Sequence, residues 1–360
     1  MRAVGWRGRA AVVLLGMTVV LGVMGLRPAW ADPPRLAQRQ LTAASYNLYL
    51  GADLTPLFSA TSPAELVQRA GQVYANVVKT DFPARAEAIA ELLAANPPDL
   101  AGLQEVALWE IGPIGGPLSP SYDFLQLLLD ALARHGLVYR PVAVNLNFSG
   151  EAPISATTAA RFTDRDVILA RADLPEALLK VSNPESHNFA AQLVIPTAIP
   201  GLSFTVPRGW SAVDVKVRGK TVRFANTHLE AFSTPVRNAQ GHELAAALAT
   251  FTHPVVLVGD LNSRPDDTAG AYGTFTGAGY ADAWTVVHGR NGGFTSGQSE
   301  LLDNVPSLLD HRIDYVLYQP RAVEALEADV IGDELNDRTF SGLWPSDHAG
   351  VVATLHLARP

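Results

Sequence analysis

Six short segments, spread over most of the chain, each join an apolar, strand-like run to acidic, amide or imidazole side chains. They span residues 45–48, 103–106, 226–230, 258–263, 312–316 and 345–351. Each apolar run has the length of a buried β-strand, so its polar residues fall where the strand meets a loop. A fold that accommodates all six must therefore bring several buried strand ends to the edges of its sheets.

The side chains at these strand ends have the chemistry of a hard-metal site. They are Asn47, Glu105, His228, Asp260, Asn262, Asp314, Asp347 and His348. Carboxylate and amide oxygens are the ligands that Mg²⁺ prefers, and a histidine can exchange a proton near neutral pH. The sequence therefore predicts a divalent-metal site with two imidazoles for proton transfer.

Composition excludes several other kinds of chemistry. The chain has no cysteine, which rules out disulfide bonds, thiolate nucleophiles and cysteine-ligated zinc. It also lacks the Gly-x-Ser-x-Gly elbow of serine hydrolases, the phosphate-binding P-loop and the His-Glu-x-x-His zinc motif. The formal net charge of the whole chain is −8, and it is near −12 without residues 1–31, which hold four arginines and no acid. This charge disfavours strong non-specific attraction to nucleic acid or anionic lipid, although plain solubility explains it equally well.

The first residues have the pattern of a secretory signal peptide, predicted to span residues 1–31. Three arginines precede an apolar run at residues 10–26, and a small-x-small cleavage site ends at Ala31. The alternative is an uncleaved membrane anchor, since the run is near the lower length limit for a span. We expect cleavage near Ala31, a secreted protein, a flexible lead-in at residues 32–40, and one domain over residues 41–360.

Local patterns predict more strands than helices. Helices are expected from Ser62-Pro63 to about Val78, from Pro83 to Asn96, and at residues 122–134 and 239–250. Strands are expected at residues 41–50, 99–106, 167–169, 213–217, 222–226, 255–258, 313–317 and 351–355, and long connections at residues 111–120, 141–165, 183–211 and 264–310. Several of the strands are apolar on both faces, so helices should cover the sheets.

In their order along the chain, the six segments resemble the endonuclease/exonuclease/phosphatase superfamily. That superfamily includes DNase I-like nucleases, apurinic endonucleases, bacterial sphingomyelinases and inositol phosphatases. The resemblance runs from about Leu41 to His356, although the inositol-phosphatase signature around the last aspartate is missing. It implies an α/β fold of four layers, an αββα sandwich in which two packed mixed β-sheets are flanked by helices.

The resemblance also implies a metal site. Glu105 would be the principal ligand, with Asn47 contacting the metal or the phosphate and Asp347 approaching the metal. The cation would be Mg²⁺, or Mn²⁺ or Ca²⁺ in its place. The alternatives are a solvent-facing acid for Glu105 and a turn-forming amide for Asn47.

The remaining residues would act on water and phosphate. By resemblance, Asp260 orients or deprotonates the attacking water, and Asn262 holds a phosphate oxygen. His348, oriented by Asp314, acts on the water or the phosphate, while His228 protonates the leaving group or stabilises the transition state. The alternatives are an Asx turn, an ordinary salt bridge and buried structural histidines.

Four further residues allow two interpretations each. Asp164 or Asp166 could brace His228, and the sequence does not choose between them; alternatively, both lie in a solvated loop. Trp210 and Trp344 could form an aromatic platform for a substrate or lie in the core.

We therefore expect a monomeric, divalent-metal-dependent hydrolase of phosphodiester bonds, without a stable protein partner. The Arg312-Ile313-Asp314-Tyr315 and Ser-Asp-His motifs resemble the nuclease branches and favour a nuclease, whose nucleic-acid substrate loop arginines such as Arg161, Arg165 and Arg264 could attract. The apolar connection at residues 189–206 instead suits a sphingomyelinase-like phosphodiesterase acting on a phospholipid headgroup, unless it is a buried strand pair. A non-catalytic phosphate-binding module is the alternative of another class, but such proteins usually lose one of the six motifs.

Overall fold

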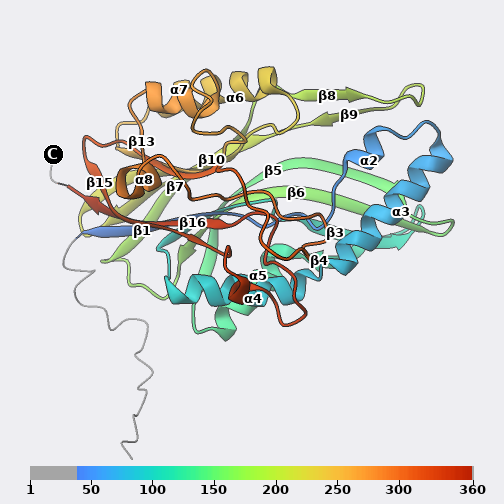
Figure 1. The fold of residues 1–360 in the computed structure, drawn as a ribbon, viewed down its shortest axis with the longest axis horizontal. Helices are drawn as coiled ribbons and strands as arrows, with labels where there is room; N and C mark the ends of the chain where they lie inside the picture. Colours follow the sequence, from blue (N-terminus) through green and yellow to red (C-terminus); the bar gives the residue numbers. More distant parts are fainter. Residues whose placement is uncertain (1–38, 359–360) are drawn as a thin grey trace, which may run out of the picture.

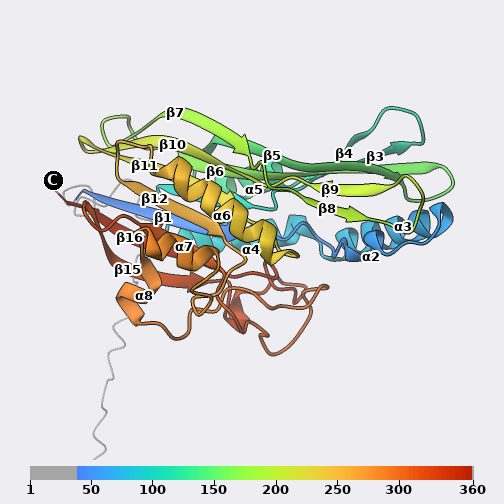
Figure 2. The same ribbon diagram turned by 90° about the horizontal axis from the view of Figure 1, so that it is seen from above.

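The computed structural model describes residues 39–358, so the predicted signal peptide and nearly all of the predicted lead-in lie outside the described residues. Two β-sheets pack face to face, and helices cover the outer face of each (Figures 1 and 2). This arrangement confirms the predicted αββα sandwich. Within residues 39–358, no helix is both long and apolar enough to cross a membrane.

The first sheet has eight strands, with the spatial order β15-β16-β1-β2-β6-β3-β4 and β5 paired to β6. Parallel pairing joins β1 to β2, and antiparallel pairing joins β1 to β16. The strands are β1 (Gln40–Asn47), β2 (Leu100–Gln104), β3 (Leu108–Pro113), β4 (Ser119–Asp123), β5 (Tyr139–Pro153), β6 (Thr158–Arg171), β15 (Val323–Ile331) and β16 (Gly350–Leu357).

The second sheet has six strands in the order β13-β14-β12-β11-β10-β7, and a separate hairpin joins β8 to β9. Strands β11 and β12 are parallel, while β14 runs antiparallel to β12. The strands are β7 (Leu179–Asn188), β8 (Leu193–Pro196), β9 (Ser203–Val206), β10 (Gly209–Val217), β11 (Lys220–His228), β12 (Val255–Asp260), β13 (Ala281–Asp282) and β14 (Asp314–Tyr318).

Three apolar cores separate the four layers. One lies between the first sheet and helices α3, α4 and α5, a second lies between the sheets, and a third lies between the second sheet and helices α6 and α7. The helices are α2 (Thr55–Phe58), α3 (Pro63–Lys79), α4 (Phe82–Ala95), α5 (Phe124–Arg134), α6 (Thr234–Leu248), α7 (Ala271–Gly277) and α8 (Ala283–His288), with a short 3₁₀ helix at Leu335–Asp337.

Local sequence signals explain two of these elements directly. The Ser62 hydroxyl accepts a hydrogen bond from the Glu65 amide at 3.2 Å, and a proline follows at the first helical position, so α3 begins where the sequence predicts. The predicted strands at residues 213–217 and 222–226 are also confirmed: they lie in β10 and β11, which form a hairpin whose turn is at Arg218-Gly219, where both residues have positive φ.

The predicted connections at residues 111–120, 141–165 and 183–211 are wrong, because they contain most of strands β3 to β9. The predicted connection at residues 264–310 is wrong in its first half, which contains α7, β13 and α8. The longest pair, β5 and β6, forms an extended antiparallel ribbon (Figure 1). Its pattern is inverted relative to an ordinary surface strand. Asn145 and Asn147 point inward, whereas Val144 and Leu146 are exposed, so the usual alternation of apolar-in and polar-out does not identify it.

A buried amide bridge connects the two sheets just below their shared edge. The Asn226 side chain on β11 accepts a hydrogen bond from Gln104 Nε2 at 2.7 Å and donates one to the Leu103 carbonyl at 3.1 Å. The sheets approach closely here, since a Cβ on Gly102 would lie 2.5 Å from Asn226 Oδ1 and 2.3 Å from a Val258 methyl. The bridge therefore fixes the relative position of the ends of β2 and β11.

We expect Asn226→Leu to lower the free energy of unfolding by about 2–4 kcal/mol, because it leaves a buried amide and a buried carbonyl without these partners. Urea unfolding followed by circular dichroism measures the change. Gln126→Ala, which removes an exposed amide on α5, is the matched control and should shift stability by less than about 0.5 kcal/mol. Equal effects of the two substitutions would contradict a structural role for the bridge.

Candidate active site

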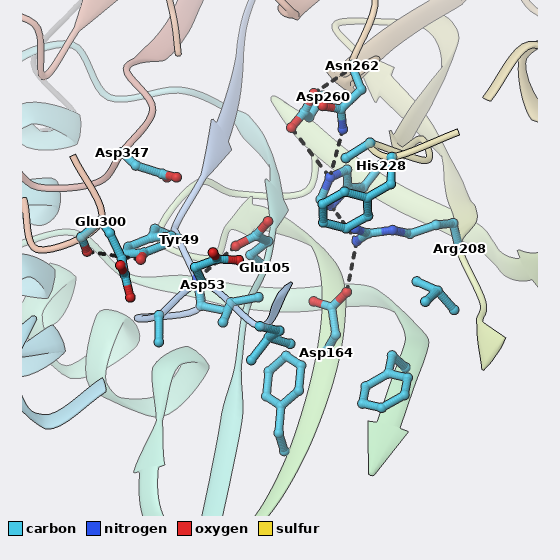
Figure 3. A pocket seen from close by; sticks show the side chains of 18 of the residues that line it. Tyr49, Asp53, Glu105, Asp164, Arg208, His228, Asp260, Asn262, Glu300 and Asp347 are labelled. Carbon is cyan, nitrogen blue, oxygen red and sulfur yellow. Dashed lines mark hydrogen bonds and ion pairs between the residues drawn. The ribbon is translucent and has the colours of Figure 1, made fainter. Parts of the chain in front are cut away.

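The eight predicted site residues gather at one edge of the sandwich. Strands β1, β2, β11 and β12 deliver their carboxyl ends to this edge, and the antiparallel strands β14 and β16 begin there. A cavity of about 380 Å³ opens at the edge and is lined by six of the eight, Glu105, His228, Asp260, Asn262, Asp347 and His348 (Figure 3). The other two, Asn47 and Asp314, lie directly behind this lining and contact it.

Asn47 joins the two halves of the site. Its Nδ2 lies 3.4 Å from Glu105 Oε1 on the first sheet and 3.2 Å from Asp260 Oδ2 on the second. Its Oδ1 accepts a hydrogen bond from the Tyr49 amide at 2.9 Å, and the Leu50 amide donates to Glu105 Oε2 at 2.8 Å. The side chain of Asn47 is therefore fixed from both ends and holds two carboxylates at one place.

Backbone strain is concentrated at this edge. Tyr49, Glu105 and Asn262 all have positive φ, at 54°, 53° and 48°. Asparagine tolerates this left-handed region, but for tyrosine and glutamate it costs free energy. At Asn262 the conformation is stabilised by a hydrogen bond from its own amide to Asp260 Oδ1 at 2.8 Å. Such strain is typical of functional sites, where it aims a side chain that a regular strand could not.

His348 and Asp314 form a buried pair, with Nδ1 of the imidazole 2.8 Å from Asp314 Oδ2. Burial alone would lower the pKa of His348, but the charges of Asp314, Asp347 and Asp260 outweigh it and raise the pKa well above its usual value. His348 is therefore an imidazolium near neutral pH. Its Nε2 lies 3.4 Å from the Ser296 hydroxyl and 3.9 Å from Asp260 Oδ2.

His228, in contrast to His348, is neutral. Its burial, with the charges of Arg208 and His348, lowers its pKa well below the usual value. Arg208 Nη1 donates to His228 Nδ1 at 2.9 Å, which places the remaining ring proton on Nε2, 3.4 Å from Asp260 Oδ2. The Asn262 amide nitrogen lies 3.3 Å from the same Nε2. The site therefore pairs a neutral imidazole with a charged one.

Arg208 is a site residue that the sequence analysis missed. Besides His228 it contacts Asp164, whose Oδ2 accepts from Arg208 Nη1 at 3.1 Å (Figure 3). Neither candidate acid braces His228 directly: Asp164 acts through Arg208, and Asp166 accepts from Asn147 Nδ2 at 2.8 Å. No local motif marks Arg208, because it follows a connection and its partners are far away in sequence.

Arg85 is a second residue that the sequence analysis missed. It is fully buried on α4, and it donates to four backbone carbonyls, those of Leu48, Tyr49, Thr80 and Pro345, at 2.7–3.1 Å. Its guanidinium thus ties the end of β1 to the loop before β16. Since this loop carries the Asp-His motif, Arg85 positions one wall of the cavity.

The other candidates lie away from the chemistry. Trp210 and Trp344 are buried in core clusters, so the platform interpretation is wrong and the core interpretation is confirmed. Arg161 pairs with Glu110, and Arg165 with Asp123, while Arg264 is exposed.

Buried carboxylates dominate the electrostatics of the cavity. Burial, reinforced by the charge of Asp347, raises the pKa of Glu105 to about 7. Burial and the charge of Asp314 raise the pKa of Asp260 to about 7. A divalent cation would favour the ionised form of both groups. The carboxylate oxygens of Glu105 and Asp347 therefore fit a hard cation such as Mg²⁺. Asn47, the third predicted ligand, turns its amide nitrogen toward Glu105 and Asp260, and this donor suits a contact with the phosphate and not with the metal.

A second group of candidate ligands lies beside the first. Within residues 39–358, Asp260, Asp314 and His348 form a compact cluster in which one ligand atom of each lies within 4.8 Å of the others. We favour the carboxylates of Glu105 and Asp347, because His348 is already bonded to Asp314 and its positive charge would repel a cation.

Comparison with known proteins gives a consistent result. The sequence model of the Endonuclease/Exonuclease/phosphatase family matches residues 44–348. No curated protein sequence matches the chain.

Solved structures share the fold. The Bacteroides thetaiotaomicron mannosyl-6-phosphatase is 16% identical, with a TM-score of 0.54 over 88% of this chain and 99% of that one. D. rerio TDP2 complexed with a single-strand DNA product is 17% identical, with a TM-score of 0.52 over 88% and 99%. The human Nocturnin catalytic domain with bound sulfate is 17% identical, with a TM-score of 0.52 over 91% and 100%.

The raised carboxylate pKa values predict how divalent cations affect stability. Because the folded pKa of Glu105 and of Asp260 lies above the unfolded one, their contribution to metal-free stability is present at acid pH and is lost as the pH rises to about 7. A bound cation offsets this loss. We expect Mg²⁺ to raise the Tm little at about pH 5 and clearly more at about pH 8.

Differential scanning calorimetry at the two pH values measures the shift. In Glu105→Gln, which keeps the shape but removes the charge, the additional stabilisation at the higher pH should shrink. A Tm shift of the same size at both pH values, or an unchanged response in Glu105→Gln, would contradict cation binding at Glu105.

Proposed function

The chain belongs to the endonuclease/exonuclease/phosphatase family, whose members are phosphoesterase and nuclease enzymes, and we propose that it hydrolyses phosphodiester bonds with the help of a divalent cation. The observation that carries the proposal is the arrangement around Asp260. A charged imidazole, a neutral imidazole and the carboxylates of Glu105 and Asp347 all face the cavity in which Asp260 lies. Phosphoryl transfer requires charge stabilisation and an activated water in such a geometry.

Glu105 and Asp347 would hold the cation, for which we propose Mg²⁺, with Mn²⁺ or Ca²⁺ as chemically related alternatives, and the Asn47 amide would contact the phosphate. When bound, the cation would neutralise charge on the phosphoryl oxygens. Asn47 has a second function in this scheme, since its amide holds Asp260 beside Glu105.

Asp260 is the group proposed to accept the proton of the attacking water. A bound cation would keep this buried carboxylate ionised, which is the form that accepts a proton. The oxygen of the water bonds to phosphorus, the bond from phosphorus to the leaving oxygen breaks, and the water proton passes to Asp260. Asn262, held by the Leu229 carbonyl at 3.0 Å, lies on the rim of the same space and would bind a phosphate oxygen.

The two histidines differ in what they can donate. His348 carries a transferable proton and a positive charge, so it would stabilise the transition state and protonate the leaving oxygen. His228 is neutral, with Nδ1 held by Arg208, so it would donate a hydrogen bond from Nε2 without giving up the proton. This assignment moves the leaving-group acid from His228, where the family resemblance implies it, to His348.

The nuclease type remains one candidate for the substrate, because the last two motifs resemble the nuclease branches. The charges near the cavity do not favour a polyanion. Arg208 is paired with Asp164, and the predicted helpers Arg161 and Arg165 are paired with acids, which leaves them little capacity to neutralise nucleic-acid phosphates.

We further propose that the protein is secreted after cleavage near Ala31 and acts as a monomer. The motivation is the leader pattern in the sequence. Amino-terminal sequencing and size-exclusion chromatography of the protein recovered from culture medium test both statements.

The proposed activity is tested with bis-nitrophenyl phosphate, plasmid DNA, RNA and sphingomyelin, each with Mg²⁺ and with excess EDTA. We expect hydrolysis of at least one phosphodiester in Mg²⁺ and its loss in EDTA. The phosphate and the buried carboxylates are both negatively charged, so a cation is needed to bring them together. Restoration by Mg²⁺ or Mn²⁺ is the control. Full activity in EDTA, or restoration by Zn²⁺ alone, would contradict the hard-metal site.

We expect His348→Ala and His228→Ala each to lower kcat by about two to four orders of magnitude, with circular dichroism unchanged. His187→Ala, at an exposed histidine outside the cavity lining, is the matched control and should retain activity.

Asp314→Asn should lower the pKa of His348 and move the basic limb of the pH-rate profile to lower pH, since the acid then loses its proton at a lower pH. An unmoved basic limb would exclude His348 as the acid.

A further inference from the structure

The catalytic cavity continues into an apolar trough. We define the trough by six side chains that line the same cavity, Leu57, Phe58, Phe148, Phe162, Phe204 and Phe232. Four separate parts of the chain supply them: α2, the β5–β6 ribbon, β9 of the β8–β9 hairpin, and the loop between β11 and α6 (Figure 1). The cavity therefore has a polar half that contains the catalytic residues and an apolar half beside it.

The aromatic rings of the trough pack against one another and leave one face open. Phe58 lies 5.2 Å from Phe204 and 6.2 Å from Phe232, measured between ring centroids. Phe148 lies 6.1 Å from Phe162. Phe58, Phe148 and Phe204 are only half-buried, and Phe232 is 59% exposed. Apolar surface of this extent inside a concave site favours an apolar ligand group.

A smaller hollow of about 80 Å³ extends the trough away from the catalytic residues. It shares Leu57, Phe148, Phe162 and Phe204 with the main cavity and is otherwise lined almost entirely by apolar side chains. Glu151 is the one charged residue in that lining. A nucleobase needs hydrogen-bonding partners for its polar edges, and this lining offers few side chains of that kind.

From this continuity we propose that the substrate is a phosphodiester that carries an aliphatic chain, which lies in the trough while the scissile phosphate lies among Glu105, Asp260 and His348. The inference rests on the proposed function and names its substrate class. The reaction is the hydrolysis described above: water supplies the oxygen that bonds to phosphorus, and one ester oxygen leaves with a proton. The aliphatic alcohol can be on either side of the phosphorus.

The test is a series of alkyl 4-nitrophenyl phosphates from methyl to decyl, kept below their micelle concentrations, with thymidine 5′-(4-nitrophenyl phosphate) as the nucleoside comparison. We expect kcat/KM to rise about fourfold for each methylene that enters the trough and then to level off when the trough is full. A kcat/KM that does not change with the length of the alkyl group would overturn the proposal. A higher kcat/KM for the thymidine ester than for any alkyl ester would also overturn it.

Variants locate the effect. Phe204→Ala should reduce the ratio of octyl to methyl kcat/KM at least tenfold, because it removes a wall of the trough. Val194→Ala on β8 is the matched control, since Val194 is 56% exposed and lies outside the cavity lining, and its ratio should stay at the wild-type value. An unchanged ratio in a folded Phe204→Ala protein would show that the aliphatic group does not bind in the trough and would overturn the proposal.

Binding separates this inference from the proposed function. Alkylphosphonates of increasing chain length cannot be hydrolysed as esters, and isothermal titration calorimetry gives their Kd without any turnover. If the methyl ester is not hydrolysed but the Kd of the phosphonates falls with chain length, the proposed activity fails and the trough assignment stands. If the methyl ester is hydrolysed and the Kd does not depend on chain length, the activity stands and the trough assignment fails.

Discussion

The contact between Asn226 and the β2 strand is the constraint on which the site depends. Glu105 comes directly after Gln104, and His228 lies two residues beyond Asn226, so a bridge between Gln104 and Asn226 sets the distance between the two halves of the site. A slip of one residue in either sheet would turn these side chains to the opposite face. Apolar packing between sheets tolerates small sliding, whereas a buried amide with defined partners does not.

The second constraint is electrostatic. Carboxylates buried at one edge repel one another, and the fold places only a few cationic groups among them: Arg208, Arg85 and the imidazolium of His348. Arg208 is engaged with Asp164 and His228, and Arg85 is engaged with carbonyls. Burial therefore raises the pKa values of Glu105 and Asp260, and the charges of Asp347 and Asp314 raise them further. A divalent cation would neutralise the ionised carboxylates, so the protein gives up some metal-free stability to create a binding site.

The sequence predicts the edge of the site well and its supporting residues poorly. Strands that end in Asp260 or Glu105 are recognisable because an apolar run stops at a polar residue, and this pattern is local. Arg208 and Arg85 act through partners that are distant in the chain, such as Asp164 and Pro345, and no spacing rule identifies them. Most of the β5–β6 ribbon, apart from residues 167–169 of β6, was missed for a different reason: its inward face is polar where it supports the site, so its periodicity runs opposite to the expected one.

That ribbon also explains how one cavity can be catalytic at one end and apolar at the other. Along β6, Phe162, Asp164 and Asp166 are all buried at alternate positions, so they point to the same face of the strand. On β5, a bulge between Leu146 and Ser149 interrupts the alternation next to Asn147 and Phe148. The boundary between the acidic and the apolar half is therefore set by neighbouring alternate positions of two paired strands. Exchange of an aromatic for a polar residue there would move the boundary without altering the strand ends that hold Glu105 and His228, which makes the ribbon the part of this fold in which substrate preference can change independently of the chemistry.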